Sequence, residues 1–168
     1  MVIPYEDEEI SLKKLINIIF TDINDYSNNV DTMMNRVILS PKNEYVDQIN
    51  NLLIEKFPGD PVKYYSFDET IDETKQCFQE DFLNTLSLSG IPPHELVLKK
   101  NCPIMLICNI NPSEGLCDGT RLICRNFQPN VIDAEITTGY YNGKRVFLPR
   151  ILLLPFENTK NPFPFKRS

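Results

Sequence analysis

A short turn made of Pro41, Lys42 and Asn43 holds the residues best suited to bind an anion. The apolar run at residues 36–40 precedes the turn, and apolar residues at helical spacing follow it as far as residue 57. A turn of this kind leaves backbone N–H groups without partners at the start of a helix, where a phosphate can bind. Asn43 could equally serve only as a helix cap, which is a common role for this side chain.

Residues for catalysis are few. Asp68 and Glu69 resemble the acid pair of an ATPase, but residues 62–67 before them do not form a fully apolar strand, and the sequence has no Gly-Lys-Thr phosphate loop. The only histidine, His94, follows Pro93 in a stretch typical of a loop, and no nucleophile, base and orienting group occur together. We therefore expect no catalytic residues in this chain.

The five cysteines do not predict a disulfide framework or a zinc site. Their number is odd, and no two of them have the C-x-x-C spacing of a zinc ribbon. Cys102, Cys108 and Cys124 lie in apolar runs, where a free thiol behaves as a small hydrophobic side chain. We expect core positions for these three residues and no bound metal.

The turn lies between elements of an α/β layer. Ser11 is a good N-cap for a helix whose apolar residues share one face: Leu12, Leu15, Ile16, Ile19 and Phe20. The β-branched run at residues 36–40 predicts a buried strand, and residues 43–57 predict a second helix that Pro58 and Gly59 end. The order helix, strand, tight turn and helix is typical of a parallel α/β layer.

After Pro92 and Pro93 the pattern changes to strands. Short runs rich in Ile, Leu and Val alternate with turn signals such as Asp118-Gly119 and Asn142-Gly143; they cover residues 95–100, 103–110, 120–127, 131–137 and 144–154. Such a series predicts a small antiparallel sheet or barrel. The final residues, 156–168, are rich in Pro, Phe, Lys and Arg and predict a linker.

Charge is distributed unevenly along the 168 residues. The whole chain has a net charge of −6, but residues 1–95 carry 18 acidic and 7 basic side chains, whereas residues 96–168 carry 5 and 10. The C-terminal part could therefore face a phosphate backbone, although small basic excesses are also common on solvated surfaces. No apolar stretch is long enough to span a membrane, and the acidic N-terminus is unlike a signal or transit peptide. We expect a nuclear or cytoplasmic protein that is not secreted.

Six segments, in order and at similar spacing, resemble Pif-type DNA helicases of superfamily 1B, which include the helicase parts of Helitron transposons. RVILSPKNEYVDQIN at residues 36–50 resembles helicase motif IV, and SGIPPHEL at residues 89–96 resembles the entry to domain 2B. The match continues with PIMLICNI, GLCDGTRL, RVFLPRI and FPFKR, which begin at residues 103, 115, 145 and 163.

The resemblance implies an α+β fold in three parts. Residues 1–60 would be a partial α/β segment of helicase domain 2A with motif IV, and residues 61–155 would be domain 2B, a small antiparallel β-barrel of the Src-homology type. Residues 156–168 would be the linker that returns towards domain 2A. In the family, motifs V and VI follow this point and a motor domain with the Walker A lysine and Walker B acids precedes it.

The resemblance also implies a binding role without catalysis. Complete family enzymes use ATP and magnesium to unwind DNA in the 5′–3′ direction, in replication, repair, recombination, telomere maintenance or transposition. This chain lacks the Walker A, Walker B and motif VI residues, so we expect no cofactor and no ATP hydrolysis by it alone. The residues expected to contact single-stranded DNA, weakly and in a salt-sensitive way, are Pro41, Lys42, Asn43, Lys99, Lys100, Arg121, Arg125, Lys144 and Arg145.

Two other interpretations remain open. The chain could be one half of a helicase that assembles with a separate motor chain, or a protein-interaction module that keeps the 2B fold. The second interpretation is favoured by the acidic N-terminal part and by Cys108, which stands where the family usually has an arginine. A second departure, Asp118 where the family usually has an asparagine, adds a negative charge beside the expected DNA surface. Tyr140 or Tyr141 could stack on a base, or could simply cover the edge of the barrel.

Overall fold

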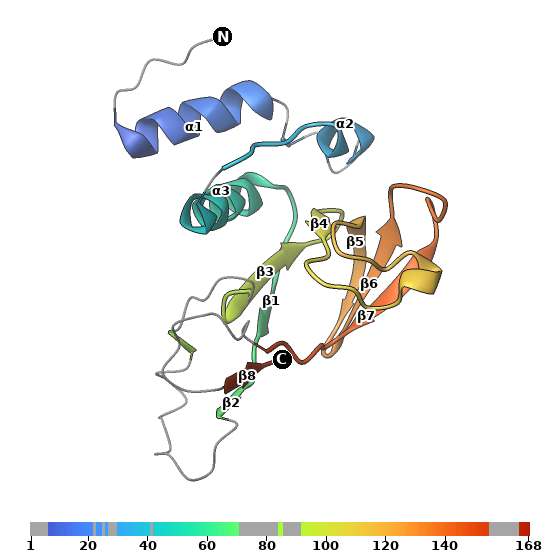
Figure 1. Ribbon diagram of the computed structural model, residues 1–168. Helices are drawn as coiled ribbons and strands as arrows, with labels where there is room; N and C mark the ends of the chain where they lie inside the picture. Colours follow the sequence, from blue (N-terminus) through green and yellow to red (C-terminus); the bar gives the residue numbers. More distant parts are fainter. Residues whose placement is uncertain are drawn as a thin grey trace.

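A computed structural model describes residues 7–21, 23–24, 26, 30–40, 42–70, 84–85, 92–154 and 165–168. Three helices come first, and antiparallel strands make up most of the remainder (Figure 1). This order agrees with the predicted α+β class.

The helices pack together at one end of the molecule. Helix α1 (Glu8–Ile19) begins three residues before the predicted Ser11 cap, because the side chain of Asp7 accepts a hydrogen bond from the Glu9 backbone N–H. Helix α2 (Val30–Met34) is short, and α3 (Asn43–Lys56) follows the predicted turn. Helices α1 and α3 contact each other, and their apolar faces bury Ile16, Phe20 and Ile49.

The segment 36–40, predicted as a buried strand, is not a strand in this structure. It pairs with no strand in the described part of the chain. Ile38 packs against the core, but Val37 and Leu39 on the other side are 56% and 87% exposed. The alternation of packed and exposed side chains is typical of a strand, but this segment forms no backbone hydrogen bonds with a described strand.

The described strands form three antiparallel sheets. Strands β1 (Pro61–Tyr65) and β3 (Glu95–Lys99) form the first, and β2 (Asp68–Thr70) and β8 (Phe165–Arg167) form the second. The third has four strands in sequence order, which are β4 (Pro103–Met105), β5 (Arg121–Gln128), β6 (Val131–Ile136) and β7 (Arg145–Pro149). Strand β4 covers only the first three residues of the predicted strand at 103–110, and a short 3-10 helix, Pro112–Glu114, follows before β5.

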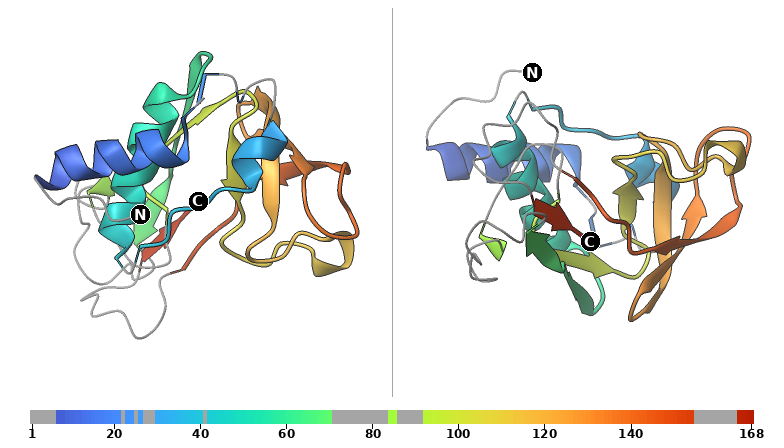
Figure 2. Two further views of the ribbon diagram at one scale, coloured as in Figure 1. Left: turned by 90° about the horizontal axis from the view of Figure 1, so that it is seen from above. Right: turned by 60° about the horizontal axis from the view of Figure 1, so that its bottom comes forward.

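Two predictions about the strands are corrected. No closed barrel forms among the described strands, because the four-stranded sheet stays open and pairs with neither of the smaller sheets (Figure 2). The end of the predicted linker is a strand, since residues 165–167 pair with residues 68–70.

Two hydrophobic clusters hold these elements together. The first joins Phe20 and Phe57, which directly follow α1 and α3, to Leu98 and Cys124 of the sheets and to Cys102 between β3 and β4. It therefore crosses residue 60, the predicted boundary between the 2A segment and domain 2B. The second lies on the four-stranded sheet and its loops: Leu106, Leu116, Leu122, Ala134, Ile136, Val146 and Leu148.

No described helix is long and apolar enough to cross a membrane.

Candidate nucleic-acid interface

Lys42 stands at the N-terminus of α3, where motif IV was predicted. It occupies the N-cap position with an extended backbone, and no side chain caps the helix, so Asn43 is the first helical residue and not the cap. The exposed Lys42 ammonium lies 5.5 Å from the centre of the Tyr45 ring. Pro41 and the side chain of Asn43 lie outside the described residues. The uncapped helix start and one cation together provide the groups that a phosphate needs.

Lys99 and Lys100, although adjacent, have opposite environments. Lys99 is buried, and its ammonium donates hydrogen bonds to the backbone oxygens of Phe57 (2.7 Å) and Glu55 (3.2 Å). It thereby satisfies carbonyls at the C-terminal end of α3 and joins that helix to β3. Its predicted role in DNA contact is corrected, because this ammonium does not face solvent. Lys100 is exposed.

Two arginines of the four-stranded sheet are paired with carboxylates. Arg125, at a bulge in β5, bonds to Glu135 (3.0 Å) and Asn101 (2.9 Å). Arg145 forms a two-pronged ion pair with Asp133, and this carboxylate raises the pKa of Arg145 above its ordinary value. A cation already paired in this way contributes less to phosphate binding, because the carboxylate competes with the phosphate.

The last two predicted cations also have partners inside the protein. Arg121 donates to the Met34 backbone oxygen (2.8 Å) and so fastens α2 to the sheet. Lys144 lies 3.5 Å from Glu114 and 5.1 Å from the centre of the Tyr141 ring. The predicted cations therefore lie along several elements, and most of them hold the fold together.

The two tyrosines predicted as stacking residues differ in exposure. The Tyr141 hydroxyl donates to the Ser113 backbone oxygen (2.6 Å), and its ring packs so closely on Gly115 that a side chain there would collide with it. Tyr140 is 95% exposed. Tyr141 thus covers the sheet edge, and Tyr140 is the tyrosine of this pair that a base could reach.

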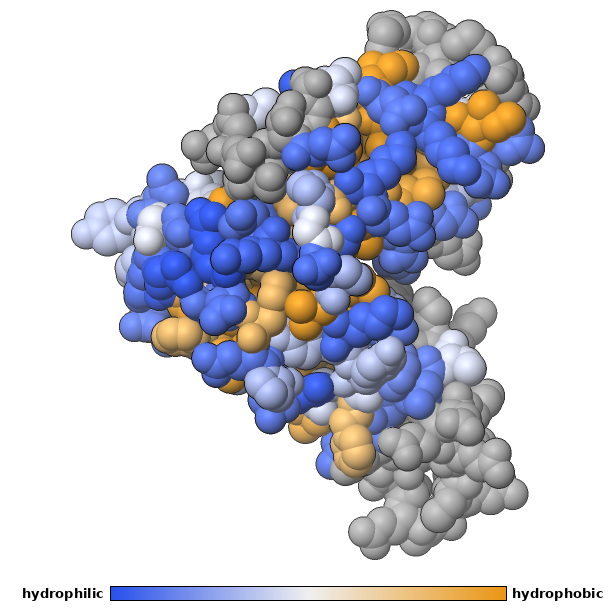
Figure 3. All heavy atoms as spheres, turned by 180° about the vertical axis from the view of Figure 1, so that it is seen from behind, coloured by the Kyte–Doolittle hydropathy of each residue, from blue (hydrophilic) through white to orange (hydrophobic). Residues whose placement is uncertain are grey.

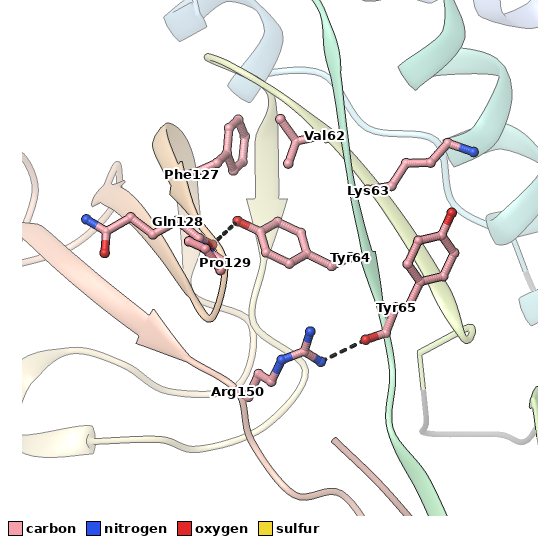
Figure 4. A pocket seen from close by; sticks show the side chains of 8 residues that line it. All are labelled: Val62, Lys63, Tyr64, Tyr65, Phe127, Gln128, Pro129 and Arg150. Atoms are coloured by element: carbon pink, nitrogen blue, oxygen red, sulfur yellow. Dashed lines mark hydrogen bonds between the residues drawn. The ribbon is translucent and has the colours of Figure 1, made fainter. Parts of the chain in front are cut away.

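The structure reveals an aromatic groove that the sequence did not predict. It lies between β1 and the β5–β6 turn, and Tyr64, Phe127, Pro129 and Arg150 are among the residues that line it (Figure 4). The alternating pattern of residues 61–65 was the available signal, but the acidic residues that follow made the segment resemble a loop. On the face seen in Figure 3, hydrophilic residues dominate, with smaller hydrophobic areas between them.

Comparison with known protein families identifies which proteins this chain resembles. Residues 81–127 match the family model described as DNA helicase Pif1, 2B domain. Over these residues the chain resembles the 2B domain of Pif1 helicases. The match runs through β3 and β4 to most of β5, so Lys99, Lys100, Arg121 and Arg125 belong to the 2B segment, whereas Lys42 and Arg145 lie outside the matched residues.

Solved Pif1 helicases resemble the chain in fold. The Pif1 helicase from Candida albicans has a TM-score of 0.50 at 17% identity, over 96% of this chain and 41% of that one. A Bacteroides Pif1 helicase has a TM-score of 0.48 at 16% identity, over 78% and 27%. A structure of two coordinating Pif1 helicases that unwind forked double-stranded DNA has a TM-score of 0.49 at 18% identity, over 100% and 36%.

The chain thus spans less than half the length of these Pif1 helicases. No curated protein matches the sequence. At these identities the structural likeness shows the fold alone. This likeness agrees with the observed order, in which helices are followed by antiparallel strands.

Near the predicted entry to domain 2B, polar side chains form a partly buried hydrogen-bond network. Ser66 Oγ donates to Asp68 (2.9 Å) and lies 2.8 Å from His94 Nδ1, while Asp68 binds Arg167. Because the one hydroxyl proton of Ser66 points to Asp68, His94 Nδ1 must carry a proton to complete its bond. The aspartate orients no base towards the serine, so the three residues are not a hydrolytic triad. Among the described residues, no cluster suited to a metal ion occurs.

Proposed function

We propose that this chain is a DNA-binding part of a Pif1-type helicase, that it binds single-stranded DNA weakly, and that it does not hydrolyse ATP by itself. The 2B match to residues 81–127 is the observation that carries the proposal.

The expected contacts are phosphate contacts through Lys42 and Lys100. Both side chains are exposed, and neither forms an ion pair within the described part of the chain. Lys42 stands at one end of the 14-residue helix α3, and Lys99, next to Lys100, bonds at the other end. The two ammonium groups would thus be separated by roughly the 21 Å length of the helix. Phosphate contacts of this kind position a strand without reading its sequence.

The salt dependence of binding to an oligothymidylate tests this proposal. Two phosphate contacts predict that log K falls against log salt concentration with a slope of about −1.4, whereas all seven predicted cations would give a slope of about −5. Fluorescence anisotropy with a labelled oligomer measures the slope. No binding at low salt would contradict the proposed function, and a steep slope would contradict the assignment to two lysines.

The absence of ATP hydrolysis has a separate reason and a separate test. The sequence contains no Gly-x-x-x-x-Gly-Lys-Ser/Thr segment, so it has no backbone cradle and lysine for a triphosphate. Phosphate release from ATP and magnesium should stay at the buffer rate, with or without single-stranded DNA. Addition of a separate motor chain is the condition under which we expect ATP turnover and unwinding.

A protein-interaction module is the second candidate, and the ion pairs of the sheet favour it. Arg125 and Arg145 face carboxylates of their own domain, and the exposed side chains of Met105 and Phe147 are apolar. A surface with paired charges and exposed apolar groups suits a protein partner better than a phosphate backbone. Failure to bind any oligonucleotide at low salt would favour this candidate.

A further inference from the structure

A groove of about 360 Å³ separates β1 from the turn that joins β5 to β6. This volume is at the small end of the range for small-molecule sites, so the groove suits one compact group. Its lining comes from two sheets: Val62, Lys63, Tyr64 and Tyr65 from the first, Phe127, Gln128 and Pro129 from the other, and Arg150 from the segment after β7.

Tyr64 and Phe127 provide a rigid aromatic wall. Their ring centres are 6.3 Å apart with a tilt of 55°, and the Tyr64 hydroxyl donates to the Gln128 backbone oxygen (2.8 Å; Figure 4). Both rings also pack against the first hydrophobic cluster. Because the rings are already held in place, a ligand that stacks on them orders no further side chain.

The charge of the groove differs from that of the chain. The lining contains Lys63 and Arg150 but no acidic residue, although the chain as a whole has a net charge of −6. Lys63 is bound to Glu95 (2.7 Å), so Arg150 is the main cation for a ligand. One nitrogen of Arg150 donates to the Tyr65 backbone oxygen (2.8 Å), which places the planar guanidinium at the groove (Figure 4). Nε and Nη1 also donate, at 3.3 Å each, to Asn130 Oδ1 and to the Ser168 backbone oxygen, so Nη2 is the donor that a phosphate would use.

We propose that this groove binds one unpaired base of single-stranded DNA. The base stacks on the wall formed by Tyr64 and Phe127, and Arg150 contacts the adjacent phosphate. Every base has an aromatic face, so this site tolerates any sequence, as phosphate contacts do. The inference rests on the proposed function and adds to it a base contact and a third phosphate contact, which would make the expected salt slope about −2.1. A proline-rich peptide is the other ligand that aromatic grooves accept, but the single cation and the small volume favour a nucleotide.

Two oligomers of equal length and charge test the proposal, one of them an oligothymidylate and the other abasic. Stacking on one site should make the wild-type chain bind the oligothymidylate roughly fivefold or more tightly at low salt. Equal affinity for the two would overturn the groove assignment and leave DNA binding intact. Absence of binding to either would overturn the proposed function and the groove assignment together.

Three variants locate the stacking site. Phe127→Leu should bring the affinity ratio of the two oligomers close to one, whereas Arg150→Gln should weaken both oligomers and keep the ratio. The matched control is Phe147→Leu, which makes the same change at an exposed phenylalanine outside the groove and should leave both affinities unchanged. Loss of the ratio in Phe147→Leu with retention in Phe127→Leu would overturn the proposal.

A spectroscopic measurement on the wild-type chain keeps the test independent of variant folding. An oligomer with one 2-aminopurine should lose fluorescence on binding, because stacking on an aromatic ring quenches it, and circular dichroism checks that each variant is folded. Unchanged fluorescence on binding would contradict the proposal. So would a proline-rich peptide that occupies the groove while the oligonucleotide stays bound.

Discussion

The Arg167 guanidinium and the Asp68 carboxylate form a two-pronged ion pair with almost no access to solvent. Arg167 Nε lies 2.9 Å from Oδ1 and Nη2 lies 2.6 Å from Oδ2, and the two side chains are 1% and 0% exposed. The remaining nitrogen donates to the Pro92 backbone oxygen (3.0 Å). One arginine therefore joins β8 to β2, which lies 99 residues away in sequence, and to the segment that enters β3.

Removal of one partner from this ion pair should destabilise the fold strongly. Arg167→Met leaves the Asp68 carboxylate buried without its cation, so we expect a loss of about 3–5 kcal/mol in the free energy of unfolding. Urea denaturation measures the loss. Lys63→Met is the control, because it breaks an exposed ion pair with Glu95 and should leave the free energy of unfolding nearly unchanged.

The double variant Asp68→Leu with Arg167→Met tests whether the loss of stability comes from the unpaired charge or from the lost shape of the buried pair. If the unpaired charge is responsible, this variant should recover most of the stability lost by Arg167→Met. Continued loss would show that the shape of the buried pair, and not the charge, holds the strands together.

The adjacent lysines 99 and 100 should give opposite results. Lys99→Met removes two hydrogen bonds to buried carbonyls of α3 and should lower the free energy of unfolding by about 1–3 kcal/mol without changing the salt slope. Lys100→Met should leave stability unchanged and reduce the slope by about 0.7. Denaturation and oligonucleotide binding of both variants check the assignment, and an equal effect of both on binding would contradict it.

Local patterns predicted the elements whose residues are close in sequence. Helix α3, its start after Lys42 and strands β3, β5, β6 and β7 are all within a few residues of their expected bounds. Each has its own apolar periodicity and a turn signal beside it. The 2B segment was accessible for the same reason, because its residues lie in one continuous stretch.

The features that the sequence did not predict depend on contacts between distant residues. Asp68 lies in an acidic run that resembles a solvated loop, and only Arg167 makes it a buried residue. Lys99 has the sequence context of Lys100, but the end of α3 decides which of the two ammonium groups faces solvent. The groove forms because β1 and the β5–β6 turn lie next to each other in the fold, and no local sequence pattern indicates this contact.

Release of Arg125 from its carboxylate should strengthen DNA binding. Glu135→Gln removes the charge that competes with a phosphate for this arginine, so we expect higher affinity and a salt slope steeper by about 0.7. Asp60→Asn is the control, since it removes one exposed negative charge without releasing an arginine. The same gain in both variants would mean that net charge alone controls binding.

The cysteines should divide into two classes by reactivity. Cys102 and Cys124 are buried, and the hydrogen bond between their thiols together with burial raises the pKa of Cys124. Cys108 and Cys117 are partly exposed. Because the thiolate is the reactive form, iodoacetamide should alkylate Cys108 and Cys117 first in the folded chain, and peptide mass mapping identifies the sites. Equal rates at Cys117 and Cys124 before urea is added would contradict the burial of Cys124.

Tyr64 should make the fold sensitive to alkali. Partial burial raises the pKa of its phenol above the ordinary value of about 10, so the unfolded chain loses this proton at a lower pH than the folded chain. Above about pH 10 the unfolded state therefore binds fewer protons, and the free energy of unfolding falls as the pH rises. Urea denaturation across this range should show a shallower fall for Tyr64→Phe, which has no phenol to ionise. Tyr140→Phe, at an exposed position, should keep the wild-type slope, and an equal slope in all three chains would show that the Tyr64 phenol does not contribute.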